Sequence, residues 1–156
     1  MTNKIFIGSD HAGLNLKKEV INYFKKTKIS FKDMGAYKYN KNDDYPDYAF
    51  KVAKNVSKGL GTGILICKMS GGMVIAANKV KGIRALNCNN SKEVKFAKQH
   101  NNANILVLAA AKIKNKNKLK SILDSWFKTR LSIQSRHIRR INKILKYENL
   151  HFKTNV

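Results

Sequence analysis

The sequence predicts an α/β fold in which a parallel β-sheet lies between layers of helices. The first reason is that short apolar runs, the length of buried strands, alternate along the chain with segments whose apolar residues recur at helical spacing. The second is composition, because 43% hydrophobic residues and a single proline favour a compact fold over disorder. With 156 residues, the chain has the length of one domain with a full core.

Five strands are expected, at residues 4–8, 29–34, 64–67, 83–88 and 104–109. Helices are expected at 14–24, from Tyr45 to the glycines at 59 and 61, from Met73, and at 91–99, 116–128 and 136–147. Pro46 suits a first helical turn, and Ser91 is the expected N-cap of its helix. The prediction is a single domain over residues 1–156: a three-layer, Rossmann-like α/β fold with a five-stranded parallel sheet and an additional C-terminal helix.

The net charge of +23 raises the question of nucleic-acid binding. Lysine and asparagine are interspersed over the whole chain, however, and the sequence has no RNA-binding aromatic signature, zinc finger or helix-turn-helix pattern. We therefore expect no specific nucleic-acid partner. The charge should still steer small phosphorylated molecules toward the protein.

The sequence predicts a cytoplasmic protein with no membrane partner. Its apolar runs are far shorter than a membrane span, and residues 1–3 lead directly into a strand without a signal peptide. Cys67 and Cys88 fall in separate strands without metal-ligand spacing, which predicts reduced cysteines and no metal. No nucleotide cofactor is expected either, because residues 8–13 place an acid and an imidazole where a dinucleotide-binding loop needs bare backbone.

The apolar run 64–67 ends at Cys67 and is followed by a turn of small and polar residues before a helix begins. In a parallel sheet, ligands bind outside the carboxyl ends of the strands, and a turn that opens a helix leaves N–H groups free for an anion. We therefore expect Cys67, close to these amides and beside Lys68, to have a lowered pKa and to act as a base. A buried structural cysteine is the alternative interpretation.

Asp10 and His11 follow the first strand, where they suit either a sugar or phosphate ligand or the capping of the next helix. A proton transfer beside a carbonyl group needs a base and a site for the oxygen that becomes negative. Cys67 and the amides of residues 70–72 would supply the two.

Two further polar groups lie at helix ends. His100 and Asn101 end the helix at 91–99, where an ordinary C-terminal cap is the alternative interpretation. Arg136 and Arg140 lie four residues apart on one helical face, an arrangement that suits a phosphate dianion. In a chain with 32 Lys and Arg, such a pair also arises by chance.

Six segments resemble the type B ribose-5-phosphate isomerases, which are grouped with the galactose-6-phosphate isomerase subunits in one sugar-phosphate isomerase family. They are SDHAG at 9–13, DYP at 44–46, GILIC at 63–67, IAANK at 75–79, GIRA at 82–85 and HNNAN at 100–104. The similarity runs almost without gaps from residue 4 to about residue 141, so that it covers nearly the whole chain.

The resemblance implies an aldose–ketose isomerase of the pentose phosphate pathway that interconverts ribose 5-phosphate and ribulose 5-phosphate through a cis-enediol, without metal or cofactor. It also implies a homodimer or homotetramer whose active site lies between subunits, with the helix at 136–147 packing on the partner. Cys67 would then be the base, and His100 would assist ring opening. The sugar and its phosphate would be bound by Asp10, His11, Tyr45, Asn101, Arg136 and Arg140, and by the anion-binding turn of Lys68, Met69, Ser70, Gly71 and Gly72.

The turn after Cys67 departs from the family's usual Gly-Thr-Gly-x-Gly. Met69 replaces the threonine, and Lys68 and Ser70 occupy glycine positions, where the backbone often has φ > 0. A phosphate-binding arginine expected after the fifth strand is Ala111 here, with Lys112 beside it. Two alternatives therefore stay open: an isomerase of another aldose phosphate, such as a hexose 6-phosphate, and a non-catalytic sugar-phosphate-binding relative.

Overall fold

The computed structural model describes residues 4–152; residues 1–3 and 153–156, which the single-domain prediction also included, lie outside the described residues. Five strands form one parallel sheet in the order β2-β1-β3-β5-β4, which confirms the predicted fold class. They are β1 (Lys4–Ser9), β2 (Phe31–Asp33), β3 (Gly61–Cys67), β4 (Ala85–Asn87) and β5 (Ile105–Ala109). The two edge strands are shorter than predicted, because each pairs with only one neighbour over three residues.

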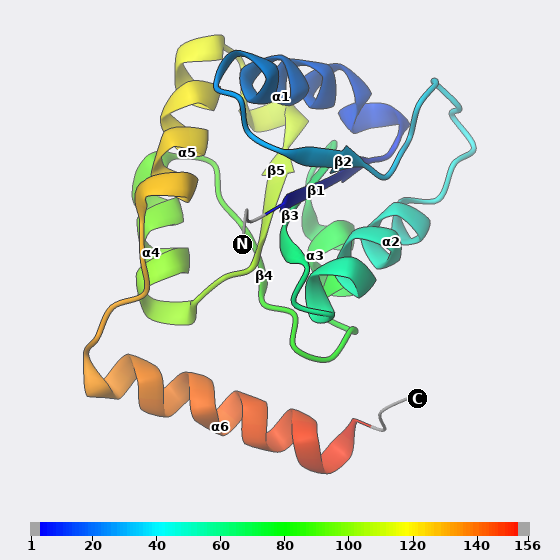
Figure 1. Cartoon of the computed structure of the whole chain (residues 1–156). Coiled ribbons are helices and arrows are strands. Elements are labelled where there is room, and N and C mark those ends of the chain that lie inside the picture. The colour runs from blue at the N-terminus through cyan, green and yellow to red at the C-terminus, as the bar shows by residue number, and fades with distance from the viewer. Residues whose placement is uncertain (1–3, 153–156) are drawn as a thin grey trace.

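Helices cover both faces of the sheet (Figure 1). On one face pack α1 (Leu14–Lys26), α4 (Ser91–Asn101) and α5 (Lys116–Lys128), and on the other α2 (Tyr45–Ser57) and α3 (Gly71–Ala77). Each face of the sheet has its own apolar core. Side chains alternate between the faces along each strand, so Ile66 lies in the first core, under α1, α4 and α5, and Cys67 lies in the second, under α2 and α3. Cys88 lies in the first core, and the sheet therefore separates the two cysteines.

Helix ends follow the expected chemistry with one correction. Pro46 lies in the first turn of α2, as predicted. Ser91 is not the N-cap of α4; that position belongs to Asn90, whose side chain accepts a hydrogen bond from the Glu93 N–H. Asn115 caps α5 in the same way. Within residues 4–152, no helix combines the length and the apolar composition needed to cross a bilayer.

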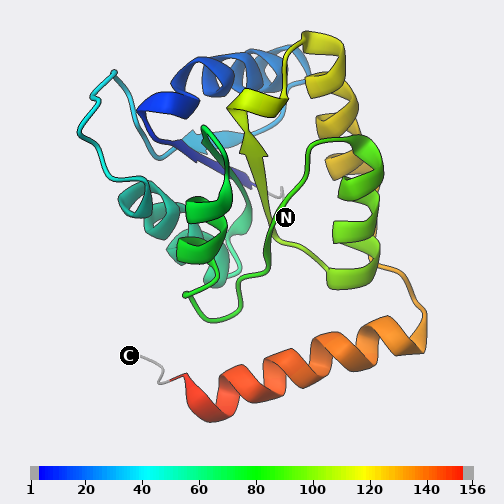
Figure 2. The same ribbon diagram turned by 180° about the vertical axis from the view of Figure 1, so that it is seen from behind.

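The last helix, α6 (Ser135–His151), is longer than the predicted 136–147. Figures 1 and 2 show it lying across the end of the domain opposite the arrowhead of β5. Ile141 is buried, and Glu148 accepts a hydrogen bond from the Gly82 N–H (3.1 Å). Much of the apolar surface of α6 remains exposed, however, at Ile138, Ile144, Tyr147 and Leu150.

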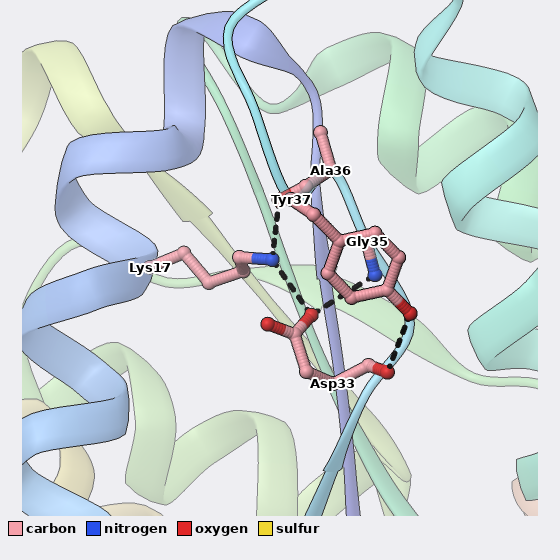
Figure 3. A network of polar contacts seen from close by, with 5 residues as sticks. All are labelled: Lys17, Asp33, Gly35, Ala36 and Tyr37. Carbon is pink, nitrogen blue, oxygen red and sulfur yellow. Dashed lines mark hydrogen bonds and ion pairs between the residues drawn. The ribbon is translucent and has the colours of Figure 1, made fainter.

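A buried lysine fixes the loop beside the carboxyl end of β1 (Figure 3). Lys17 of α1 is 2% exposed, and its Nζ donates to Asp33 Oδ1 and to the Ala36 carbonyl, both at 2.6 Å. The Gly35 N–H donates to the same carboxylate oxygen (2.9 Å). Two backbone hydrogen bonds then join residues 35 and 36 to Ser9, the residue before Asp10.

We expect the substitution Lys17→Met to lower the free energy of unfolding by about 2 to 3 kcal/mol, because it leaves the Asp33 carboxylate and the Ala36 carbonyl without their donor. Asp33 is partly exposed, which keeps the loss below that of a fully buried pair. Urea unfolding measures the effect. The matched control is Lys18→Met at the next, exposed position, where a change within about 0.5 kcal/mol is expected. Equal losses in the two variants would contradict the role of the buried pair.

Candidate active site

Cys67 ends β3 at the carboxyl edge of the sheet, where the sequence placed it. Its side chain is 7% exposed, and Sγ accepts a hydrogen bond from the Ser70 N–H (3.0 Å). Burial raises the pKa of the thiol; the Ser70 amide opposes this shift, and the charge of Asp10 adds to it. The predicted lowering of the Cys67 pKa is therefore wrong. Lys68 is exposed, and its charge does not offset the burial.

At Ser70, but not at Lys68, the turn after Cys67 adopts the left-handed backbone that glycine would favour. Ser70 has φ +71°, in the left-handed region, although it carries a side chain. Its hydroxyl donates to the Met69 carbonyl, while the Met69 side chain is exposed. Because the Ser70 amide already donates to sulfur, the amides free to receive an oxyanion are those that follow it, at Gly71 and Gly72.

Tyr45 lies against this turn. A Cβ added to Gly72 would come within 2.4 Å of the Tyr45 ring, whereas a Cβ on Gly71 would meet nothing within 4 Å. The first residue of α2 therefore packs over the start of α3 and brings a phenol to the turn after Cys67. A side chain at position 72 would therefore displace the half-exposed Tyr45 ring from the turn.

Asp10 and His11 lie at the same edge of the sheet. Asp10 is buried, its carboxylate accepts a hydrogen bond from the Gly13 N–H (2.9 Å), and burial raises its pKa. Its own N–H donates to the carbonyl of Ile66, next to Cys67 (3.3 Å). The Nδ1 of His11 lies 2.5 Å from a carboxylate oxygen of Asp43, a residue that the sequence analysis missed. The two are 32 residues apart, and no spacing pattern links them.

The other predicted site residues, on α4 and α6, lie at the opposite edge of the sheet, where the parallel strands begin. His100 lies in the last turn of α4, five residues before the start of β5, whereas Cys67 pairs with Ala109, the last residue of β5. The length of β5, about 3.3 Å for each residue, therefore separates the two groups within one chain. Asn101, Arg136 and Arg140 lie on the His100 side and are exposed.

His137, which no sequence pattern singles out, packs against His100, with ring centroids 4.2 Å apart and ring planes tilted by 35°. It is 4% exposed, and its buried Nδ1 has no hydrogen-bond partner among residues 4–152. Burial lowers its pKa, and the charges of His100, Arg136 and Arg140 lower it further. Its neighbour Arg136 donates from Nε to Gln134 (3.1 Å). Histidine and arginine side chains thus gather at the start of α6.

The turn after β5 completes the carboxyl edge. Ala111 donates its N–H to the Lys68 carbonyl (3.1 Å), which ties this turn to the one after Cys67. Ala111 and Lys112 are both exposed. In place of the arginine that the resemblance leads us to expect, this chain has a neighbouring lysine, which supplies a point charge without the bidentate geometry of a guanidinium group.

A thiol, a phenol, an Asp-His pair and free amides at one carboxyl edge define an α/β protein with a small polar ligand site. A family model described as Ribose/Galactose Isomerase matches residues 5–144, and the chain belongs to that family. It is 43% identical over 152 residues to a probable ribose-5-phosphate isomerase B of Mycoplasma genitalium, covering 95% of this chain and 97% of the relative.

Solved structures of ribose-5-phosphate isomerases B support the same family assignment. The ribose-5-phosphate isomerase B of Mycoplasma genitalium, which holds bound ribulose-5-phosphate, is similar with a TM-score of 0.90 and 41% identity, over 96% of this chain and 98% of that one. The ribose-5-phosphate isomerase B of Clostridium thermocellum has a TM-score of 0.88 and 41% identity, with coverages of 95% and 99%. The similarity therefore includes α6, not only the sheet.

Proposed function

We propose that Cys67 is the base of an enzyme that interconverts ribose 5-phosphate and ribulose 5-phosphate. The chain is an aldose–ketose isomerase by its family and its relatives. The observation that carries the role of Cys67 is the position of its sulfur at the carboxyl edge of the central strand, hydrogen-bonded to the turn that offers free amides. Asp10, His11 and Tyr45 surround that position and are proposed to bind the sugar.

In the proposed reaction the Cys67 thiolate removes the proton from C2 of the open-chain aldose. The C2–H electrons form the C1=C2 bond, and the carbonyl oxygen O1 becomes negative and is then protonated, giving a cis-enediol. Loss of the O2 proton and delivery of the proton from sulfur to C1 produce the ketose. The free amides at Gly71 and Gly72 stabilise the charged oxygen, a contribution that in other enzymes amounts to about 10² to 10³ in rate.

The remaining residues are proposed to come from a second copy of the chain. His100, Asn101, Arg136 and Arg140 lie at the edge of the sheet opposite Cys67, so a single chain cannot bring them together. The apolar residues exposed along α6, together with Ile133 at 93% exposure just before it, suit a subunit interface. In the resulting dimer, which is also the unit of a tetramer, His100 assists ring opening and the arginines hold the phosphate.

The proposed compartment is the cytoplasm. Both cysteines are free and lie on opposite faces of the sheet, so they cannot pair with each other, and an unpaired thiol base suits a reducing environment.

The test is turnover of ribose 5-phosphate by the purified protein, followed by formation of ribulose 5-phosphate. We expect kcat/KM for ribose 5-phosphate to exceed that for galactose 6-phosphate by at least about tenfold. Ribose without phosphate is the control and should not be converted, because the site is proposed to hold the phosphate. Faster conversion of the hexose phosphate would contradict the pentose assignment, and saturable binding without turnover would contradict the enzyme.

A further inference from the structure

The side chain that contacts His11 comes from a different part of the chain. Asp43 belongs to the segment between β2 and α2, and its Oδ1 lies 2.5 Å from the His11 Nδ1. At this distance the imidazole Nδ1–H donates to the carboxylate in a charge-assisted hydrogen bond. The ring of Tyr39 also meets the His11 ring edge-on, with centroids 5.6 Å apart. The imidazole is thus held on two sides.

This arrangement leaves one nitrogen of His11 for a ligand. Nδ1 is committed to Asp43, while Nε2 has no hydrogen-bond partner within the part of the chain that the structure describes. The His11 side chain keeps 28% of its surface exposed. Because the partner at one ring nitrogen fixes which nitrogen carries the proton, Asp43 controls what Nε2 can offer to a substrate.

Asp43 is costly for the fold. Its carboxylate is 5% exposed, and the second oxygen, Oδ2, is buried without a close hydrogen-bond partner among residues 4–152, although the phenol of Tyr48 interacts with this carboxylate at longer range. A buried carboxylate with an unsatisfied oxygen destabilises a protein, so a purely structural position would favour a neutral side chain. Such a group needs an explanation in the site that it faces.

The neighbouring charges belong to the same site. Asp10 precedes His11, and the pKa of its carboxyl is raised mainly by burial and further by Asp43. Tyr48 of α2 also has a raised pKa, from burial first, then from the charge of Asp43 and from hydrogen bonding to its carboxylate. Tyr48 in turn packs against Gly35, in the loop that Lys17 fixes beside Ser9. Asp43 therefore lies between the imidazole and a phenol at the carboxyl edge.

We propose that Asp43 is a positioning residue for His11: it holds the imidazole with Nδ1 as donor and so presents Nε2 to the sugar phosphate. The expected effect of Asp43 on kinetics rests on the proposed function. Its expected effect on the proton position of the His11 ring does not. The ligand class is a phosphorylated sugar, whose oxygens would accept a hydrogen bond from Nε2 when the ring is protonated and donate one when it is neutral.

The state of the ring can be measured directly by nitrogen NMR. The chain has four histidines, and a His11→Asn variant identifies the signals of His11 in a ¹⁵N-labelled protein. In the wild type, the neutral ring should carry its proton on Nδ1. Asp43→Ala should abolish that preference, whereas Asp43→Asn should keep it, because the amide oxygen still accepts the Nδ1–H. Asp47→Asn, which changes an exposed carboxylate four residues away in the first turn of α2, is the matched control and should leave the His11 proton position unchanged.

Kinetics separate positioning from structure. Asp43→Ala should raise KM for ribose 5-phosphate about tenfold with a smaller change in kcat, and Asp43→Asn should raise it less. In the His11→Asn background, Asp43→Ala should add less than about twofold, because its effect passes through the missing ring. A structural role would instead add its full loss in both backgrounds.

An unchanged His11 tautomer and KM in Asp43→Ala would overturn the proposal, and so would losses that add in the double variant. If the wild type does not convert ribose 5-phosphate, the proposed function fails, while the nitrogen spectra still decide whether Asp43 sets the proton position on His11. Should Asp43→Ala fail to fold, the spectra of wild type and Asp43→Asn carry the test, and a proton on Nε2 in both overturns the proposal.

Discussion

Replacing Cys67 by alanine should lower kcat for ribose 5-phosphate by at least about 10³-fold, because a positioned proton-transfer group contributes roughly 10² to 10⁴ and the other thiol, Cys88, lies on the opposite face of the sheet. The side chain is small and lies at the end of β3, so the fold should remain intact. A direct assay of ribulose 5-phosphate formation measures the loss, and circular dichroism checks the fold. Activity equal to the wild type would remove Cys67 as the base.

The matched control for Cys67→Ala is Cys88→Ala. Cys88 is 1% exposed on the other face of the sheet, and burial first and Glu93 second raise its pKa to about 12. It therefore stays a neutral thiol under ordinary conditions, where it acts as a small apolar side chain. Its replacement should cost some stability and leave kcat close to that of the wild type.

The pH dependence of the wild type follows from the same thiol. Burial raises the Cys67 pKa, so the thiolate is a minor form at neutral pH and its fraction grows as pH rises toward that pKa. Consequently kcat/KM should increase from roughly pH 7 to 9. A flat profile in that interval would mean that a group with a lower pKa removes the proton.

The central strands could be predicted because each is marked by a pattern of neighbouring residues in the sequence. Each central strand is a continuous apolar run buried on both faces, as the run ending at Cys67 illustrates. The edge strands were predicted too long, since apolar composition says nothing about how many residues find a pairing partner. The N-cap of α4 was wrong by one residue, because Asn90 and Ser91 are both good caps and only the backbone geometry distinguishes them.

The site was predictable in its residue types and less so in its electrostatics. The common location of Asp10, His11 and Cys67 could be predicted because they end or follow strands whose carboxyl ends share one edge of the sheet. Asp43 and His137 were missed because their partners, His11 and His100, are brought near by tertiary structure alone. The Cys67 pKa was predicted in the wrong direction since burial outweighs the nearby amides, and burial depends on packing that a sequence does not display.

Two inactive variants should restore each other's activity. If Cys67 of one copy works with His100 of the other, a dimer of one Cys67→Ala chain and one His100→Asn chain contains one fully substituted site and one intact site. Such a hetero-oligomer, co-expressed with two different tags and purified on both, should show about half of the wild-type activity per dimer, while each variant alone has almost none.

The control for this experiment is a chain that carries both substitutions. Paired with either single variant, it cannot form an intact site in any arrangement, so activity should stay absent. Within one chain the length of β5 separates Cys67 from His100, and a shift of a few ångströms in a loop does not span that gap. Failure of the two single variants to restore activity would therefore mean that His100 and the α6 arginines act elsewhere, and the base would have to work with the groups at its own edge, Asp10, His11 and Tyr45.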